Sequence, residues 1–296
     1  MKKLLPVLLV LVLLTGCGSG PTGVIGGADG PTEIMVDETG AVPLPETAPA
    51  RPISAPAVVT EGRELEQDYD LSAALDGFSE WMHNSTRNQN SVGLLAELPE
   101  QDAAIYGVAK EQGTAMLLRW GDSLAEFDWN YGGPQIAGPQ LRYWDVDDDG
   151  QDEVVLVNHI GSGTGVSVEE LHIVEKQEDG TLTDYVFPEK LWGEQLAFLL
   201  GTAAVSGRTF AVLGEELVDI TRHLPEGLEP EALRGLGTGS IARFEADCSD
   251  GTDIRFSGSA CLDADGFYYC YVADLSADVS YADGVYTLSN FHLDSN

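Results

Sequence analysis

Residues 244–293 read FEADCSDGTDIRFSGSACLDADGFYYCYVADLSADVSYADGVYTLSNFHL, and this stretch decides the fold class. Asp-Gly pairs recur in it at 250–251, 265–266 and 283–284, and alternating segments flank each pair. An Asp-Gly pair in this context is the strongest short-range signal of a β-hairpin, because both residues tolerate the positive φ of a tight turn. We therefore predict a mainly β fold of antiparallel sheets and hairpin meanders with two or three short helices; the alternative is an α+β fold.

The segments upstream of this meander contain further predicted strands and two helices. Strands are expected at 103–109, 114–120 and 123–130, separated by glycine-containing turns. Asp70 can cap a helix whose apolar face consists of Leu71, Ala74, Leu75, Phe78, Trp81 and Met82. A second helix is expected to start at Pro188, with an inward face formed by Leu191, Trp192, Leu196 and Leu199.

The first seventeen residues have the parts of a secretory signal. Two lysines are followed by an apolar run, 4–14, that is too short to span a bilayer, and Leu14-Thr15-Gly16-Cys17 comes next. This order resembles the lipobox of bacterial lipoproteins, which implies cleavage before Cys17 and lipidation of that cysteine. Since two acyl chains anchor a protein stably, the resemblance predicts a lipid anchor in the cell membrane, on its extracytoplasmic face. The alternative is an ordinary cleaved signal with an incidental cysteine.

The chain is strongly acidic, and this restricts its partners. Its 15 Lys and Arg residues against 49 Asp and Glu residues give a formal net charge of −34. Such a surface repels nucleic acid and anionic membranes, so neither is an expected partner apart from the membrane that holds the lipid. It attracts cations wherever carboxylates are crowded.

Composition divides the rest of the chain into a tether and a folded domain. Residues 18–66 are rich in Gly, Pro, Ala, Thr and acids with almost no aromatics, so we predict a disordered tether there. Residues 67–296 are predicted to form a β-rich, calcium-binding extracellular domain. Within the tether, residues 25–32 (IGGADGPT) resemble a signature of the β subunit of sodium-translocating decarboxylases, whose aspartate lies in the ion path. Here Asp29 would lie outside a bilayer, so sodium transport is not expected.

The constellation with the most chemistry is DVDDDGQDE at 145–153, which directly precedes the apolar run 154–157. Carboxylates occupy the first, third, fifth and ninth positions, and Gly150 occupies the sixth. Alternate spacing lets three short side chains converge on one point, while the glycine permits a sharp turn. A set of hard oxygen ligands suits Ca²⁺ much better than Zn²⁺, which prefers nitrogen and sulfur.

The spacing also distinguishes between kinds of calcium loop. An EF-hand needs a bidentate glutamate at the twelfth position, where this chain has Leu156 in a predicted strand. The loop instead resembles those of FG-GAP and VCBS-type repeats, in which the last acid is at the ninth position and a strand follows. That resemblance implies one Ca²⁺, with Asp148 and Asp152 facing solvent and with ligands from Asp145, Asp147, Asp149, the Gln151 carbonyl and Glu153. The alternative is a solvated acidic turn without metal. A bound ion is expected to brace the fold rather than to bridge a ligand.

Whether two of the cysteines can form a disulfide depends on the register of the hairpins. If 265–266 is a two-residue turn, Cys261 lies directly opposite Cys270, at a separation that a disulfide accepts. An exported protein permits this bond. Cys248 is predicted from the neighbouring hairpin, in which Phe244 pairs with Phe256 and Ala246 with Ile254. In that register Cys248 lies on the face of the sheet opposite Cys261 and is expected to be a small buried thiol.

No motif identifies a reaction. The five histidines form no HExxH, no GxSxG elbow occurs, and a lone histidine in a strand, such as His159 or His172, is more often structural. Gly161–Gly165 lacks the lysine of a P-loop and reads as a hairpin loop between strands 154–160 and 166–174, although it could border a ligand site.

Two function classes follow. The first is a non-catalytic, calcium-braced module that binds an extracellular protein or a glycan. The second is an extracytoplasmic hydrolase with dispersed catalytic acids. A concave pocket lined by two or more desolvated acids would favour the hydrolase, and an exposed aromatic patch without such a pocket would favour the binding module.

Overall fold

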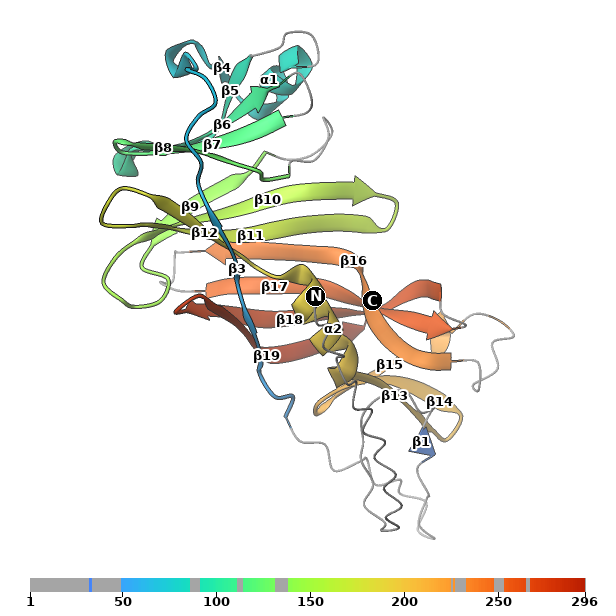
Figure 1. Ribbon diagram of the computed structural model, residues 1–296. Coiled ribbons are helices and arrows are strands. Elements are labelled where there is room, and N and C mark those ends of the chain that lie inside the picture. Colours follow the sequence, from blue (N-terminus) through green and yellow to red (C-terminus); the bar gives the residue numbers. More distant parts are fainter. Residues whose placement is uncertain are drawn as a thin grey trace, which may run out of the picture.

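The computed structural model describes the parts of the chain at 32–33, 49–85, 91–110, 114–130, 138–224, 226, 233–247, 253–264 and 267–295 (Figure 1). In these parts strands far outnumber helices, and the predicted mainly β class is confirmed. The described helices are α1 (Phe78–Ser85), α2 (Glu189–Leu199) and three short 3₁₀ turns at Leu71–Ala73, Pro99–Gln101 and Thr221–His223. None of the described helices has the length and apolar content that crossing a membrane requires.

A large sheet forms the body of the molecule. Its main path runs β2-β19-β18-β17-β16-β11-β10-β9, and β3 and β12 extend it beside β11. Neighbouring strands are antiparallel except at β11 and β16. Its strands are β2 (Ile53–Pro56), β3 (Val58–Glu61), β9 (Gln140–Trp144), β10 (Glu153–Gly163), β11 (Val166–Lys176), β12 (Leu182–Val186), β16 (Leu233–Asp247), β17 (Asp253–Ala264), β18 (Phe267–Ala282) and β19 (Val285–Ser295).

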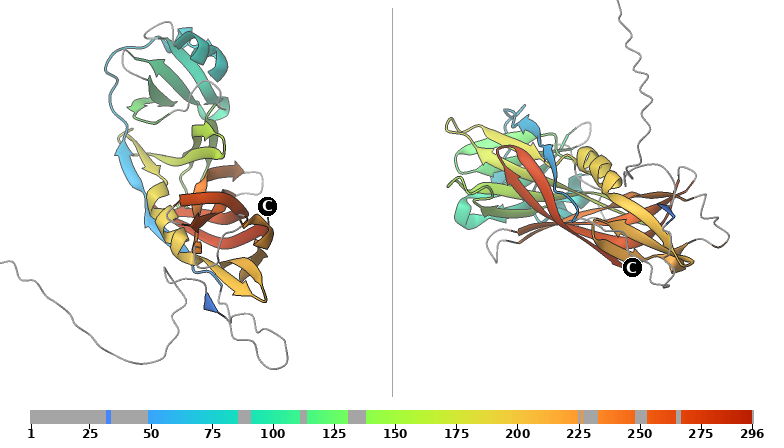
Figure 2. Two further views of the ribbon diagram at one scale, coloured as in Figure 1. Left: turned by 90° about the vertical axis from the view of Figure 1, so that its right-hand side faces the viewer. Right: turned by 90° about the horizontal axis from the view of Figure 1, so that it is seen from below.

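Two smaller sheets pack on this body. The five-stranded one, at the top of Figure 1 with α1, follows the order β4-β5-β6-β7-β8. The four-stranded one has the order β1-β13-β14-β15, and α2 precedes its second strand. Figure 2 shows α2 lying against the large sheet. The strands of these sheets are β4 (Leu75–Asp76), β5 (Val92–Leu98), β6 (Ala103–Ala109), β7 (Thr114–Trp120), β8 (Ser123–Phe127), β1 (Thr32–Glu33), β13 (Leu200–Val205), β14 (Arg208–Leu213) and β15 (Glu216–Asp219).

Strand β10 belongs to two hydrophobic cores at once. Because successive side chains of a strand point to opposite faces, Val155 and Val157 enter the core shared with α2 and β16–β19. Val154 and Leu156 enter a second core, formed with the five-stranded sheet. All four residues are buried. The unbroken apolar run 154–157 is thus explained by burial on both faces.

The C-terminal hairpins agree with the predicted meander. Asp283 and Gly284 have positive φ, and Ala282 pairs with Val285 across them, as in a two-residue turn. The predicted pairs Phe244–Phe256 and Ala246–Ile254 are both present. The turns at 250–251 and 265–266 and the Cys248 prediction lie outside the described residues. The predicted strands 103–109 and 114–120 coincide with β6 and β7, and β8 ends three residues before the predicted 130.

The boundary of the predicted tether at residue 66 is wrong. Strands β2 and β3 lie before it, and they pair with β19 and β12 in the large sheet. Ile53 and Ala55 alternate with exposed neighbours and are buried. Two short strands need few apolar residues of their own when partner strands complete the sheet, and the composition of the segment therefore understated its order. Cys17 and Asp29, with their predicted roles, lie outside the described residues.

The helix predicted from Asp70 is interrupted. Asp70 does cap a helical turn, since its carboxylate accepts from the Ser72 amide, but this 3₁₀ turn ends at Ala73. Gly77 then has φ +78°, a left-handed conformation that breaks the helix before α1 begins. In α1, Trp81 and Met82 are buried, as their place on the apolar face predicts.

Candidate metal centre and a polar cavity

The acidic loop 145–153 joins β9 to β10 at the edge of the large sheet. Glu153 is the first residue of β10 and pairs with Trp144, so the sheet fixes both ends of the loop. Between them Asp148 and Gly150 have φ of 60° and 91°. These two left-handed residues turn the chain tightly, and aspartate and glycine are the residue types that tolerate this conformation.

Three of the predicted ligands converge. One carboxylate oxygen from each of Asp145, Asp147 and Asp149 lies within 4.8 Å of the others. Backbone amides hold these side chains in place: Asp145 accepts from the amides of Asp149 and Gly150 at 3.1 and 2.9 Å, and Asp149 accepts from the amide of Gln151 at 2.7 Å. Oxygen donors at this spacing fit a hard divalent cation such as Ca²⁺.

Glu153 lies beneath this cluster and is nearly inaccessible, with 3% of its surface exposed. Its Oε2 accepts from the Val146 amide at 2.8 Å. Burial and the negative charges of the three aspartates raise the pKa of Glu153 to about 7. Burial and the neighbouring aspartates also raise the pKa of Asp147. A divalent cation among these carboxylates would offset their repulsion.

The remaining residues of the loop lie on its outside. Gln151 is exposed, and its side-chain amide donates to Asp149 at 3.3 Å; the role of its carbonyl as a ligand stays a prediction. Asp148 and Asp152 are exposed, as expected of residues that face solvent.

The expected opposition of Cys261 and Cys270 is off by one residue. Ala264 pairs with Phe267 and Asp263 with Tyr268, as expected, but a bulge then pairs Cys261 with Tyr271. Both cysteines are thiols here, and Cys270 donates to the carbonyl of His223. Burial raises the pKa of Cys261 to about 12, and the nearby Cys270 adds to this effect. The disulfide stays a prediction, which peptide mapping without reductant tests: two free thiols in air-purified protein would reject it.

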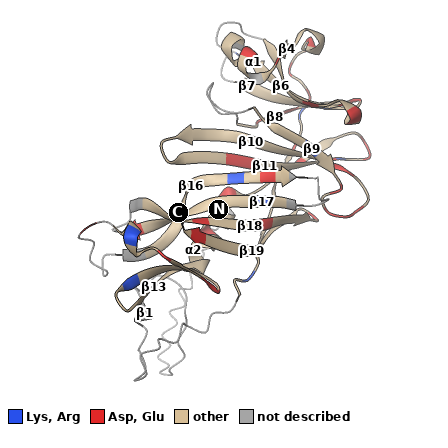
Figure 3. Cartoon of the chain, turned by 180° about the vertical axis from the view of Figure 1, so that it is seen from behind, with Lys and Arg blue, Asp and Glu red and all other residues tan. Residues whose placement is uncertain are grey.

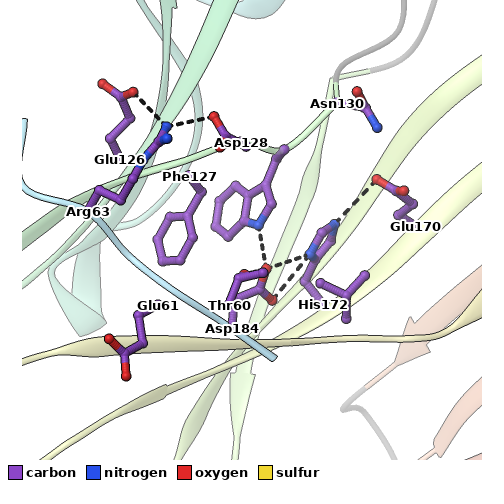
Figure 4. Close-up of a pocket in the computed structure, with 12 residues that line it drawn as sticks. Thr60, Glu61, Arg63, Glu126, Phe127, Asp128, Asn130, Glu170, His172 and Asp184 are labelled. Carbon is purple, nitrogen blue, oxygen red and sulfur yellow. Dashed lines mark hydrogen bonds and ion pairs between the residues drawn. The ribbon is translucent and has the colours of Figure 1, made fainter. Parts of the chain in front are cut away.

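A cavity of about 160 Å³ lies where β8 meets β3, β11 and β12 (Figure 4). The described residues that line it are Thr60, Glu61, Arg63, Glu126, Phe127, Asp128, Trp129, Asn130, Glu170, His172, Asp184 and Val186. No pattern in the sequence predicted this cavity, and the single histidine at position 172 indicated only a structural role. The glycine loop 161–165, expected as a possible border of a ligand site, is not part of the lining.

Sheet register brings the polar groups of the cavity together. His172 pairs with Val186, so Asp184, two residues earlier on β12, is its diagonal neighbour on the same face. Thr60 pairs directly with Asp184 across β3 and β12. On β11, Val174 lies on this same face and enters the core formed with the five-stranded sheet. Leu171 and Ile173 point to the opposite face and enter the core shared with α2.

Asp184 is completely buried and its carboxylate is well satisfied. It accepts from His172 Nδ1 at 3.1 Å, from Trp129 Nε1 at 2.5 Å and from the Thr60 hydroxyl at 3.3 Å. Phe127 stacks on Trp129, with ring centroids 4.2 Å apart, and fixes the indole. A buried carboxylate with this many donors is fixed in one position.

His172 is held as a buried cation. Burial opposes its charge, but Asp184 and Glu170 outweigh burial and raise the pKa of His172 to about 9. Both ring nitrogens therefore carry protons at neutral pH. Nε2 forms an ion pair with the Glu170 carboxylate at 3.8 Å, a separation beyond hydrogen-bond range (Figure 4).

A second buried acid lies at the other end of the lining. Glu126 pairs with Arg63 at 3.0 Å and with Lys110 at 2.6 Å, and only 1% of its side chain is exposed. Figure 4 shows its carboxylate turned away from His172. Arg63 also pairs with Asp128 at 2.6 Å.

A sequence signal for the cavity exists, although it is weak. His172 and Asp184 occupy positions in β11 and β12 that share a face with Val174 and Leu182, which are core residues. Polar residues at two core positions of adjacent strands indicate a buried polar pair. The pairing of β11 with β12 has to be known before this signal can be interpreted.

Comparison with protein-family models, with curated proteins and with solved structures found no match to this chain.

Proposed function

We propose that this chain is a lipid-anchored extracytoplasmic lipoprotein whose β-rich domain is braced by one calcium ion and acts as a non-catalytic binding module. In this proposal Cys17 carries the lipid, and the partner is an extracellular protein or a glycan. The observation that supports it best is the convergence of the Asp145, Asp147 and Asp149 carboxylates above the buried Glu153. Carboxylates this close oppose closure of the loop unless a cation neutralises them.

Thermal melts test the calcium part of the proposal. The chain from Gly18 to Asn296 is heated with excess calcium and with a chelator. A ligand at about a hundred times its Kd stabilises by about 2.7 kcal/mol, so the melting temperature should rise by roughly 5–10 °C. Equal melting temperatures would contradict a calcium brace.

Two variants in the same loop separate binding from a general charge effect. Asp147→Asn removes a converging carboxylate and should abolish most of the calcium-dependent rise. Asp148→Asn removes the same charge from an exposed residue, and asparagine tolerates the positive φ there. This variant should therefore keep the full response. A similar loss in both variants would indicate only diffuse attraction of cations.

A hydrolase is the second candidate, and the cavity is the observation that favours it. Glu126 and Asp184, two of the lining acids, are desolvated. Each is already engaged with cations, however: Glu126 with Arg63 and Lys110, and Asp184 with His172. A general base or nucleophile needs a carboxylate that is free to accept a proton or attack. This pairing supports the binding module over the hydrolase.

Chromogenic substrates distinguish the two candidates. The binding module predicts no hydrolysis of nitrophenyl glycosides and nitrophenyl esters above the rate of a heat-denatured sample. Hydrolysis by the wild-type chain that is lost in Asp184→Asn would establish the hydrolase instead.

A further inference from the structure

Glu175 on β11 lies opposite the last acid of the loop 145–153. In the antiparallel pair β10–β11, Val154 pairs with Val174, and the same register continued by one residue sets Glu153 opposite Glu175. The two carboxylate side chains therefore point to the same face of the sheet, the face that contributes to the large core. Like charges directly opposite each other destabilise a sheet, so this arrangement favours a compensating positive charge nearby.

The charge of Glu175 also acts on the converging aspartates. Burial raises the pKa of Asp147 most, followed by the charge of Asp149. Glu175 comes next and contributes more than Asp145, although Asp145 belongs to the loop. Within the described part of the chain, no Lys or Arg forms a salt bridge with any of these acids. Figure 3 shows acidic residues recurring across the sheets where basic ones are few.

A buried tyrosine joins Glu175 to the C-terminal hairpin. The Tyr281 hydroxyl, on β18, donates to Glu175 Oε1 at 2.7 Å. The Tyr281 ring packs on Tyr185 of β12 and Tyr286 of β19, with ring centroids 5.6 and 5.1 Å away. Burial and the Glu175 carboxylate raise the pKa of Tyr281, so its hydroxyl keeps the proton that it donates. One carboxylate of β11 is thus hydrogen-bonded to the hairpin β18–β19.

A cation bound in the loop would change the balance of these forces. Without it, repulsion from Asp147 opposes the position in which Glu175 accepts from Tyr281. With it, the same position brings a negative charge near a divalent cation and is favoured. A bond that the ion strengthens must in turn strengthen binding of the ion, because coupling between two sites is reciprocal.

We propose that Glu175 is a further acid of the calcium site, and that its hydrogen bond with Tyr281 couples calcium in the loop to the hairpin β18–β19. The inference rests on the proposed calcium brace and extends it to a residue outside the loop. Because Glu175 is engaged with a tyrosine, it acts as a positioning charge beside the ligands and is not itself a ligand. Groups of this kind commonly change metal affinity by about tenfold or more.

Isothermal titration calorimetry with calcium chloride on the chain from Gly18 to Asn296 tests the charge. Glu175→Gln removes the charge but keeps an oxygen that can accept from Tyr281, and we expect it to weaken calcium binding about tenfold. The matched control Glu178→Gln makes the same charge change at an exposed turn residue and should bind calcium like the wild type. An unchanged affinity in Glu175→Gln, or an equal loss in both variants, would overturn the proposal.

Tyr281→Phe tests the coupling, because it removes the hydroxyl and keeps every carboxylate. It should weaken calcium binding about threefold, since the lost hydrogen bond is one that the ion strengthens. Tyr271→Phe is its control: this hydroxyl, also on β18, donates to the carbonyl of Gly165, and its loss should leave calcium binding unchanged. A lower melting temperature of Tyr281→Phe with an unchanged calcium affinity would make the bond merely structural and overturn the coupling.

The same titrations separate this inference from the calcium brace on which it rests. A wild-type chain that binds no calcium would reject both. Calcium binding by the wild type that Glu175→Gln leaves unchanged would reject the inference alone. Melts in chelator verify the fold of each variant.

Discussion

The side chain of Trp81 restricts which residues can occupy two neighbouring positions of the five-stranded sheet. It is fully buried, and its indole N–H donates to the carbonyl of Ser91. A Cβ atom added at Gly93 would lie 2.0 Å from the Trp81 ring, and one at Gly107 would lie 2.8 Å from it. Both glycines are therefore required by the close approach of the indole to β5 and β6.

Replacing Gly93 with alanine should destabilise the protein by roughly 1–3 kcal/mol, because the added methyl group overlaps the fixed ring of Trp81. Thermal melts measure the effect. Gly201→Ala on β13 is the control, since its Cβ would meet nothing closer than Val212 at 4.0 Å. Equal melting temperatures for the two variants would show that the small sheet adjusts to the methyl group.

The pKa of His172 gives a pH prediction of definite sign. It is about 9 in the folded chain against an ordinary 6.5, so the folded state binds more protons between these values. The stability contributed by the charged imidazole is complete below about pH 6.5 and is lost as the pH rises through 9. If the folded state binds one proton more than the unfolded state, the free energy of unfolding falls by at most about 1.4 kcal/mol per pH unit.

Urea denaturation across this pH window measures the slope. The double variant His172→Gln, Asp184→Asn removes both charges of the pair and should lose the slope. His292→Gln changes an exposed histidine and should keep it. A double variant with the wild-type slope would contradict the assignment to His172.

Residue-level prediction worked where the signal was local. The three converging aspartates follow from spacing within one loop, and their convergence is present. The pair His172 and Asp184 is formed by register between two strands, and the sequence shows only two polar residues twelve positions apart. Burial and a charged partner define that pair, and neither is visible before the strands are paired.

At the scale of elements, α2 shows a clear difference between its two faces. Leu196 is fully buried in the large core, whereas Phe198 is 74% exposed. Leu196→Ala should cost about 2–5 kcal/mol because it leaves a cavity. Phe198→Ala should change the stability by less than about 0.5 kcal/mol. Chemical denaturation measures both, and comparable losses would mean that Phe198 contacts something in solution.

Elements were predictable where neighbours in sequence pair with each other. The β18–β19 hairpin needs only its Asp-Gly turn and two alternating segments. The pairing of β2 with β19 joins segments more than two hundred residues apart, and no local pattern encodes it. The bulge that shifts Cys261 is likewise a response of the sheet, which no count from the turn reveals.

At the scale of the whole molecule, the proposed lipid anchor predicts that the chain is found in the membrane fraction. Cys17→Ser should move the chain from the membrane fraction to the soluble fraction and abolish incorporation of labelled palmitate. Cys270→Ser alters a cysteine of the folded domain and should leave the membrane fraction unchanged. A Cys17→Ser chain that stays in the membrane fraction would contradict the anchor.

The pairing of β2 with β19 has a consequence for how the chain is made. Among the described strands of the large sheet, the earliest lies against the last, so this sheet can close only after residues 285–295 have left the ribosome. Contacts between distant segments slow folding, because loop closure has to precede the contacts that compensate for it. A chain that folds late stays extended for longer, and an extended chain is the form that a secretory channel can thread. The proposed export would thus meet a chain that has not yet closed its large sheet.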